Sequence, residues 1–182
     1  MLQPAKPRVL IVDDHPTNRL AYTTLLEPSY SVVAAETGQQ ALELTLRDGY
    51  AVILLDVRMP GMDGFEVAEL LRKRERTSHT PIVFLSAFDQ TAEQAKKGYQ
   101  VGATDFLFSP IDGELLKFKV ATYVQIYLRN ESLRLQLHQL QDSLRALQED
   151  IGDTISEQVH RRINAPERQV EEFKRELGSL KV

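Results

Sequence analysis

Cysteine is absent from the 182 residues of this chain, which excludes disulfides, thiolate nucleophiles and cysteine metal ligands. Long apolar runs are missing too. None approaches the roughly 18–20 residues that span a bilayer, and the first ten residues lack the apolar stretch of a signal peptide. Excess positive charge is also lacking, because the net charge is −4. We therefore expect a cytoplasmic protein without direct contact with membranes or nucleic acid.

Glycine, proline and phenylalanine become scarce after residue 120, while leucine, glutamine, arginine and glutamate become common. This change predicts a globular domain over residues 1–120 and a helix over 121–163 that continues from the last helix of the domain. Gly152 and Pro166 are poor residues for a helix interior. A separate C-terminal helix is therefore predicted over 164–182, after a kink or a break, and a helical hairpin is the alternative.

Short apolar runs alternate with amphipathic segments through the first 120 residues. The runs predict strands at 9–12, 32–35, 52–55, 82–85 and 106–108, and the segments between them predict helices at 17–26, 38–47, 64–73, 91–99 and from 111 onward. This alternation indicates the α/β class, specifically a (βα)5 unit with a doubly wound, parallel, five-stranded sheet. No separate catalytic domain is expected beyond it.

Acidic residues follow two of the predicted strands. Asp13 and Asp14 come after the first, and Asp56 comes after the third. Ligands of open parallel sheets bind at the carboxyl ends of the strands, so these side chains should meet at one edge. Carboxylates suit Mg2+, and we expect Asp14 and Asp56 to bind it directly, Asp13 through a water molecule, and Arg58 through its carbonyl. Asp56 is then placed to attack phosphorus as a nucleophile.

Each acidic residue alone has a simpler interpretation as a helix cap. Asp14 or His15 would begin the first helix, and Asp63 would cap the third. The combination favours the phosphoryl-transfer interpretation, because the acidic strand ends occur together with the segment from Met59 to Gly64 and with a hydroxyl residue after the fourth strand.

The segment LLDVRMPGMDGFE, from Leu54 to Glu66, resembles the phosphorylation loop of the bacterial response-regulator receiver family. The resemblance covers about residues 7–120 and is of the chemotaxis-regulator type, with a flavodoxin-like fold. It implies that Asp56 accepts a phosphoryl group from a histidine kinase or a phosphotransfer protein. It also implies that Ser86, followed by Ala87, contacts the phosphoryl group, and that Phe106 is an aromatic switch residue.

The chain departs from this family at the end of the fifth strand, where Ser109-Pro110 replaces the family's Lys-Pro. Charge-assisted hydrogen bonds are roughly twice as strong as neutral ones, so serine should weaken contact with the phosphoryl group. The resemblance further implies a cis bond before Pro110. Two explanations stay open: a drifted or engineered position, or a degenerate receiver that acts as a dimeric scaffold without phosphorylation.

Apolar residues of the C-terminal part recur in steps of four and three from Leu133 to Ile151, which is a heptad repeat. This stripe, called the seam below, predicts a coiled coil and a parallel homodimer, and packing on the chain's own domain is the alternative. Asn130 would fix the register, and extending the register backward adds Tyr123. The seam comprises Ile126, Asn130, Leu133, Leu137, Leu140, Leu144, Leu147 and Ile151.

Beyond the seam the spacing changes to steps of four through Ile155, Val159 and Ile163, so a coiled coil must drift or unwind there. His160 begins a segment that resembles weakly the His-Arg-x-x-Asn box of one histidine-kinase subgroup. A phosphotransfer or kinase-dimerisation helix is therefore a third interpretation, and a solvated basic face is the alternative explanation of this segment. The downstream effector is not identified by any motif.

Overall fold

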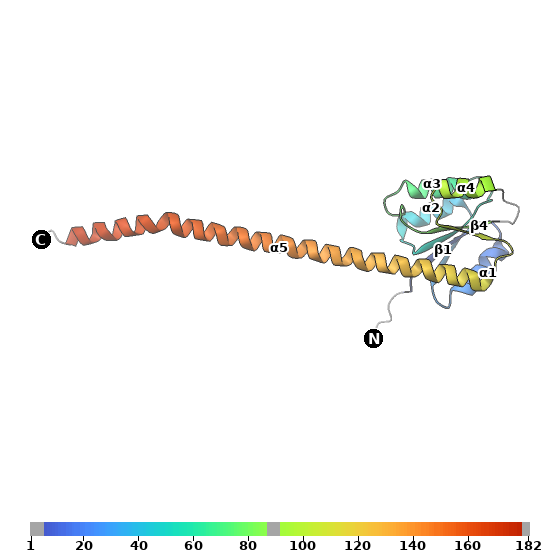
Figure 1. Ribbon diagram of the computed structural model, residues 1–182, viewed down its shortest axis with the longest axis horizontal. Helices are drawn as coiled ribbons and strands as arrows, with labels where there is room; N and C mark the ends of the chain where they lie inside the picture. The colour runs from blue at the N-terminus through green and yellow to red at the C-terminus, as the bar shows by residue number, and fades with distance from the viewer. Residues whose placement is uncertain (1–5, 87–91, 180–182) are drawn as a thin grey trace. The chain divides into compact units, whose positions relative to one another are not determined.

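A computed structural model describes residues 6–86 and 92–179 of the chain (Figure 1). Five parallel strands form one sheet in the order β2-β1-β3-β4-β5. Their bounds are β1 Arg8–Val12, β2 Ser31–Ala35, β3 Val52–Asp56, β4 Ile82–Ser86 and β5 Asp105–Phe108. The predicted α/β class and all five predicted strands are thus confirmed, each within one residue at either end.

Helices alternate with these strands: α1 Pro16–Leu26, α2 Gly38–Arg47, α3 Gly64–Arg72, α4 Ala92–Gln100 and α5 Gly113–Ser179. Local sequence explains where several of them begin. The Thr37 side chain caps α2, and Pro16 occupies the first turn of α1, where its missing amide proton costs nothing. Asp63 and Glu66 form a capping box at the start of α3.

Two hydrophobic layers cover the sheet, because successive side chains of a strand point to opposite faces. In β3, Ile53 and Leu55 belong to one layer, and Val52 and Leu54 belong to the other. Helices α2, α3 and α4 lie over the first face, and α1 and the first part of α5 lie over the second (Figure 1). The central strands β1, β3 and β4 are therefore almost wholly buried, as is typical of parallel sheets, whereas the edge strand β2 is only partly buried.

Helix α5 is 67 residues long and continues through Gly152 and Pro166 without interruption. The separate helix predicted for 164–182 is thus part of one helix as far as Ser179. The chain divides into two compact units at residues 1–131 and 132–182, both of which contain part of α5. The boundaries proposed at 120 and 163 stay predictions. Among the described residues, no helix is both long enough and apolar enough to cross a membrane.

Candidate functional site

The carboxyl ends of β1 and β3 bring the predicted acidic residues together. These strands pair in parallel, with Val12 opposite Leu55, so the residues that follow them lie side by side. Asp13, Asp14 and Asp56, together with His15, each offer a ligand atom within 4.8 Å of the others. The position is where strand order reverses in the sheet, between β1 and β3, and such positions form ligand sites in open α/β sheets.

Asp13 is the most enclosed of these carboxylates, with 1% of its surface exposed. Its Oδ1 atom accepts a hydrogen bond from the His15 amide at 2.8 Å. The Asn18 side-chain amide donates to its Oδ2 atom at 3.0 Å and to its Oδ1 atom at 3.3 Å. Burial raises the pKa of Asp13, and these hydrogen bonds and the nearby His15 oppose the rise. The carboxylate therefore has a fixed orientation.

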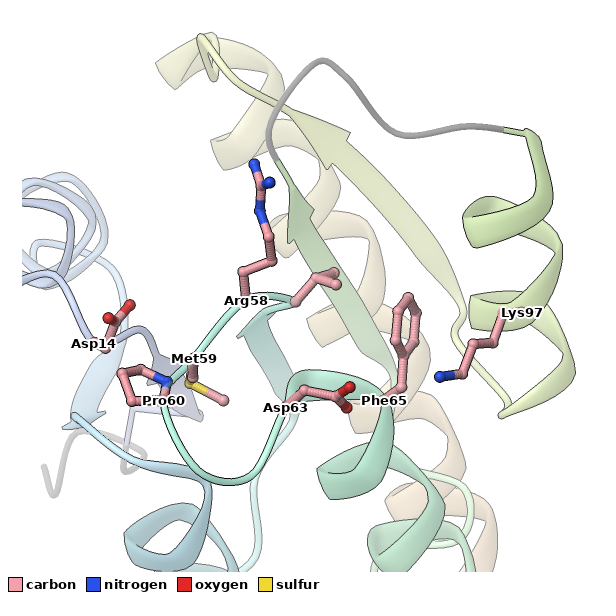
Figure 2. A pocket seen from close by; sticks show the side chains of 8 residues that line it. Asp14, Arg58, Met59, Pro60, Asp63, Phe65 and Lys97 are labelled. Atoms are coloured by element: carbon pink, nitrogen blue, oxygen red, sulfur yellow. The ribbon is translucent and has the colours of Figure 1, made fainter.

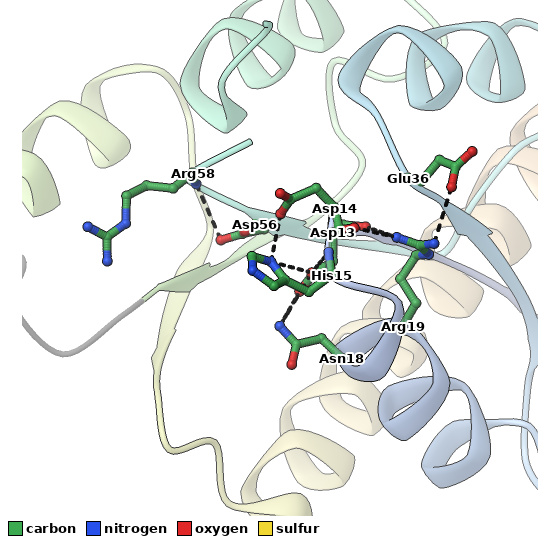
Figure 3. A network of polar contacts seen from close by, with 8 residues as sticks. All are labelled: Asp13, Asp14, His15, Asn18, Arg19, Glu36, Asp56 and Arg58. Atoms are coloured by element: carbon green, nitrogen blue, oxygen red, sulfur yellow. Dashed lines mark hydrogen bonds and ion pairs between the residues drawn. The ribbon is translucent and has the colours of Figure 1, made fainter. Parts of the chain in front are cut away.

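Asp14 is more accessible than Asp13, with a quarter of its side chain exposed. The His15 ring lies against it, with Nδ1 at 2.9 Å from the Asp14 Oδ1 atom (Figure 3). His15 also precedes α1 at the N-cap position, but its side chain makes no capping hydrogen bond. The capping interpretation is therefore wrong for Asp14 and for the His15 side chain, and it is right for Asp63 in α3.

Asp56, at the end of β3, accepts a hydrogen bond from the Arg58 amide at 3.3 Å. Burial raises the pKa of Asp56 to about 6, and the charges of Asp13 and Asp14 add to the rise. Carboxylates held this close together repel one another, and a divalent cation bound among them would relieve the repulsion. Hard oxygen donors in this arrangement fit Mg2+, which prefers carboxylates and retains several waters.

The side chain of Arg19, from the second turn of α1, contacts the backbone of the acidic pair Asp13 and Asp14. Its Nη1 atom donates to the carbonyl oxygens of Asp13 and Asp14 at 2.8 and 2.9 Å. Its Nη2 atom lies 3.2 Å from a carboxylate oxygen of Glu36, the residue that follows β2 (Figure 3). The guanidinium group thus contacts the backbone of the acidic pair, whose carboxylates point away from it (Figure 3).

Tyr22 lies one turn of α1 beyond Asn18 and packs against the core on the α1 and α5 face. Burial raises the pKa of Tyr22 to about 12, and the negative charges of Asp13 and Asp56 contribute to the rise. Its phenol is therefore a neutral hydroxyl at physiological pH.

An open groove of about 540 Å3 adjoins the acidic site (Figure 2). Asp14 and the loop after β3 form one part of it, and Lys97 of α4 contributes a cation. The Lys97 Nζ atom lies 4.7 Å from the centroid of the Phe65 ring, a distance typical of a cation–π contact. The groove is lined by Asp14, Val57, Arg58, Met59, Pro60, Asp63, Phe65 and Lys97.

The predicted switch residues lie at the ends of β4 and β5. Ser86 is buried, with 3% of its surface exposed, and its carbonyl accepts a hydrogen bond from the Ser109 amide at 2.7 Å. Ser109 and Pro110 are exposed, and the peptide bond between them is cis, as the family resemblance implies. Ala87 lies outside the described residues.

Phe106 is buried, with 7% of its surface exposed. Its ring contacts those of Phe84, Tyr99 and Phe108, with centroid distances of 5.1 to 6.1 Å. It also fills the space beside Gly98, where an added Cβ atom would lie 2.2 Å from the Phe106 Cζ atom. The aromatic residue thus has its ring turned inward in this structure.

The seam residues lie along α5, with about half of each apolar side chain exposed; the exposed fractions run from 47% at Ile126 to 60% at Leu137. Tyr123 does not belong to this stripe, because its hydroxyl donates to Asp105 at 2.9 Å and its ring packs on the hydrophobic core beside the sheet. The backward extension of the register to Tyr123 is therefore wrong. His160 is exposed, and its Nδ1 atom lies 3.2 Å from the Ser156 carbonyl of the same helix.

Asn18, Arg19, Tyr22 and Glu36 contact or influence the acidic residues, and the sequence reasoning did not single them out. The sequence did contain an indication of Asn18 and Tyr22. These two residues lie one turn apart, and therefore on one face, in the helix that directly follows the acidic pair. Glu36 offered a weaker signal, namely a carboxylate that follows the second strand.

Comparison with known proteins agrees with this geometry. The family model "Response regulator receiver domain" matches residues 9–121. Response regulator PleD of Caulobacter vibrioides is 40% identical over 128 residues, which are 70% of this chain and 28% of PleD. Protein PilH of Pseudomonas aeruginosa is 36% identical over 110 residues, which are 60% of this chain and 90% of PilH. The chain thus spans little more than a quarter of PleD and nearly all of PilH.

Solved structures give the same result. The chemotaxis protein CheY4 of Vibrio cholerae superposes with a TM-score of 0.62 at 32% identity, covering 65% of this chain and 99% of CheY4. The residues that the family model matches, 9–121, include all of the sheet except Arg8, together with the three carboxylates at its edge. The chain therefore belongs to the response-regulator receiver family of two-component signal transduction.

Proposed function

We propose that this chain is a response regulator in which Asp56 accepts a phosphoryl group from the phosphohistidine of a partner kinase or phosphotransfer protein. The observation that carries the proposal is the meeting of Asp13, Asp14 and Asp56 within 4.8 Å at the edge of the sheet. Asp56 ends β3 directly before Val57 and Arg58, which line the open groove through which a donor would approach, and the other two carboxylates lie beside it.

In the transfer, an oxygen atom of the Asp56 carboxylate attacks the phosphorus atom. The bond from phosphorus to the imidazole nitrogen breaks, and its electron pair stays on that nitrogen. Mg2+, held by Asp13, Asp14, Asp56 and the Arg58 carbonyl, would neutralise negative charge on the phosphoryl oxygens. The hydroxyl of Ser86 would then donate a hydrogen bond to one of these oxygens.

The Asp56 reaction is tested by incubating the chain with acetyl phosphate and Mg2+ and measuring its intact mass. We expect an increase by one phosphoryl group in the unmodified chain and no increase in Asp56→Asn, because the amide is not a nucleophile toward phosphorus. Asp142→Asn, which changes an exposed carboxylate of the tail, is the matched control and should be modified normally. No adduct in the unmodified chain, or an adduct that persists in Asp56→Asn, would contradict the proposal.

The output proposed for the phosphorylated receiver is a parallel dimer joined through the seam. Each seam leucine or isoleucine has about half of its side chain exposed in the single chain, and pairing would bury these side chains. Signal would pass from Ser86 and Phe106 to α5, whose residues Leu116 and Val120 are fully buried against the sheet. An effector would recognise the change in the paired helices.

A degenerate receiver is the second candidate function, and Ser109 is the observation that favours it. Without an ammonium group at this position the receiver would serve as a dimeric scaffold, whatever its state of phosphorylation. In the mass experiment, an adduct that is absent from Asp56→Asn would support the phosphorylated switch, and no adduct would support the scaffold. Phosphate that is lost in His160→Ala and kept in Asp56→Asn would instead assign phosphotransfer to His160.

A further inference from the structure

Arg19 is enclosed although it is charged, with 18% of its side chain exposed. Buried or half-buried cations are stable only when they are paired and their donors are satisfied. Arg19 meets this condition with two backbone carbonyls, those of Asp13 and Asp14, and with the Glu36 carboxylate. These contacts join the loop after β1 to the residue after β2.

The backbone of Asp13 is held from two directions. Its amide donates to the Ala35 carbonyl at 3.1 Å, and its carbonyl accepts from Arg19. A second bond from the same guanidinium nitrogen fixes the Asp14 carbonyl. Because these hydrogen bonds fix the two peptide planes, they also fix the directions in which the side chains of Asp13 and Asp14 leave the backbone.

The positive charge of Arg19 works against a cation at this site. Coulombic repulsion alone means that a neutral residue at position 19 should bind a divalent cation more tightly. A role in orientation makes the opposite prediction, because metal ligands must be held close to their binding geometry. The sign of the effect therefore distinguishes the two roles.

We propose that Arg19 is a positioning residue, which holds the backbone of Asp13 and Asp14 so that their carboxylates are oriented to bind a divalent cation together with Asp56. This inference rests on the proposed function and extends it to a residue outside the acidic cluster. The planar fork of arginine suits the task, since two of its nitrogens reach three acceptors. Lysine carries the same charge on a single nitrogen and cannot reproduce this arrangement.

The test is calorimetric titration of the full chain with Mg2+. Arg19→Lys keeps the charge and removes the fork, and Arg19→Gln removes both. We expect the dissociation constant for Mg2+ to rise about fivefold or more in each variant. Arg8→Lys and Arg8→Gln are matched controls. Arg8 begins β1, at the end of the strand opposite to the acidic pair, and forms an exposed ion pair with Asp48. They should leave the dissociation constant unchanged.

Acetyl phosphate provides a second measurement. The Mg2+ concentration for half-maximal phosphorylation should rise in Arg19→Lys, and the rate at saturating Mg2+ should stay within about twofold of the original. An unchanged melting temperature would show that the fold is intact. If Arg19→Gln fails to fold, the dissociation constant of the charge-conserving variant Arg19→Lys for Mg2+ tests the positioning role on its own.

A dissociation constant that is unchanged in Arg19→Lys, or that falls in Arg19→Gln, would overturn the positioning role while leaving phosphorylation of Asp56 in place. An equal loss of affinity in the Arg8 variants would also overturn it, because the effect would not be specific to position 19. If the unmodified chain bound no Mg2+, the proposed function and this inference would both be contradicted.

Discussion

Ser109 directly follows β5 and has a short, uncharged side chain at a position where the receiver family has lysine. It is exposed, and its amide donates a hydrogen bond to the Ser86 carbonyl at the end of the neighbouring strand β4. A hydroxyl gives at most a neutral hydrogen bond there. The missing ammonium also leaves the repulsion among Asp13, Asp14 and Asp56 without compensation from this side.

Ser109→Lys should therefore accelerate formation of the Asp56 adduct. A charge-assisted contact in place of a neutral one contributes about 1 kcal/mol, which corresponds to roughly a fivefold increase in rate. The rate is measured with acetyl phosphate and Mg2+ by intact mass. Ser109→Gln is the matched control, because it is long but uncharged. An equal acceleration in both variants would attribute the effect to length and not to charge.

The acidic residues of the site were predictable because sequence shows where a buried strand ends, and parallel strands end at one edge. Asn18 and Arg19 were not predictable in the same way. Their side chains turn back toward the loop that precedes their helix, and this direction depends on the backbone of Asp13 and Asp14. Only the folded loop shows which atoms lie within their reach.

Strand β5 and helix α5 are joined by a polar cluster at Asp105. Lys119 and Tyr123 of α5 both donate hydrogen bonds to its carboxylate, and the Phe106 amide donates a third at 2.8 Å. Burial alone would raise the pKa of Asp105, but the hydrogen bonds from Lys119, Phe106 and Tyr123 and the charge of Lys119 hold it below its usual value. The ionised carboxylate therefore stabilises the contact between β5 and α5.

Asp105→Asn should lower the free energy of unfolding by about 1 kcal/mol at pH 7, a value that allows for the partial exposure of the pair. The folded pKa is lower than the unfolded one. The stabilisation is therefore complete above the unfolded pKa of about 3.9 and is lost as pH falls through the folded pKa. Urea unfolding between pH 7 and pH 3 should show the two proteins converging below about pH 4. A constant difference across this range would contradict the assignment.

Alternation of apolar and polar residues predicted the strands and the helices well, since two buried faces leave a strong pattern in a parallel sheet. It gave no indication of the contact between Gly98 and Phe106. A glycine inside α4 only weakens a helix by intrinsic propensity, whereas in the folded domain it provides the space that the Phe106 ring occupies. Contacts of this kind depend on the separation of elements that sequence spacing does not report.

The chain as a whole combines a receiver with a helical extension, and its oligomeric state is a prediction from the seam. Leu137→Lys should give a monomer, because an ammonium in a coiled-coil core must lose its water, and burial of a leucine contributes about 1.5–3 kcal/mol. Light scattering after size exclusion measures the mass. Leu135→Lys is the matched control, since Leu135 is 65% exposed and lies outside the seam, and it should remain a dimer. A monomeric unmodified chain would refute the predicted dimer.

The end of the chain shows the limit of residue propensities. Gly152 and Pro166 predicted a kink or a break; helix α5 continues through both residues to Ser179 without a break, and the kink stays a prediction. A single unfavourable residue costs about 1 kcal/mol for glycine and about 3 kcal/mol for proline. Long flanking helices on both sides can outweigh that cost. Propensity therefore marks weak points of a helix better than it marks helix ends.

The hydrogen bond from the Ser109 amide to the Ser86 carbonyl joins the carboxyl ends of the neighbouring strands β4 and β5. Because Pro110 follows Ser109 and α5 begins at Gly113, we expect a displacement of the Ser86 backbone to act on the start of this helix. In the proposed function, this main-chain hydrogen bond is therefore the shortest link that we expect between the phosphorylation site and α5. Side-chain substitutions at Ser109 can retune the chemistry and still leave this link in place.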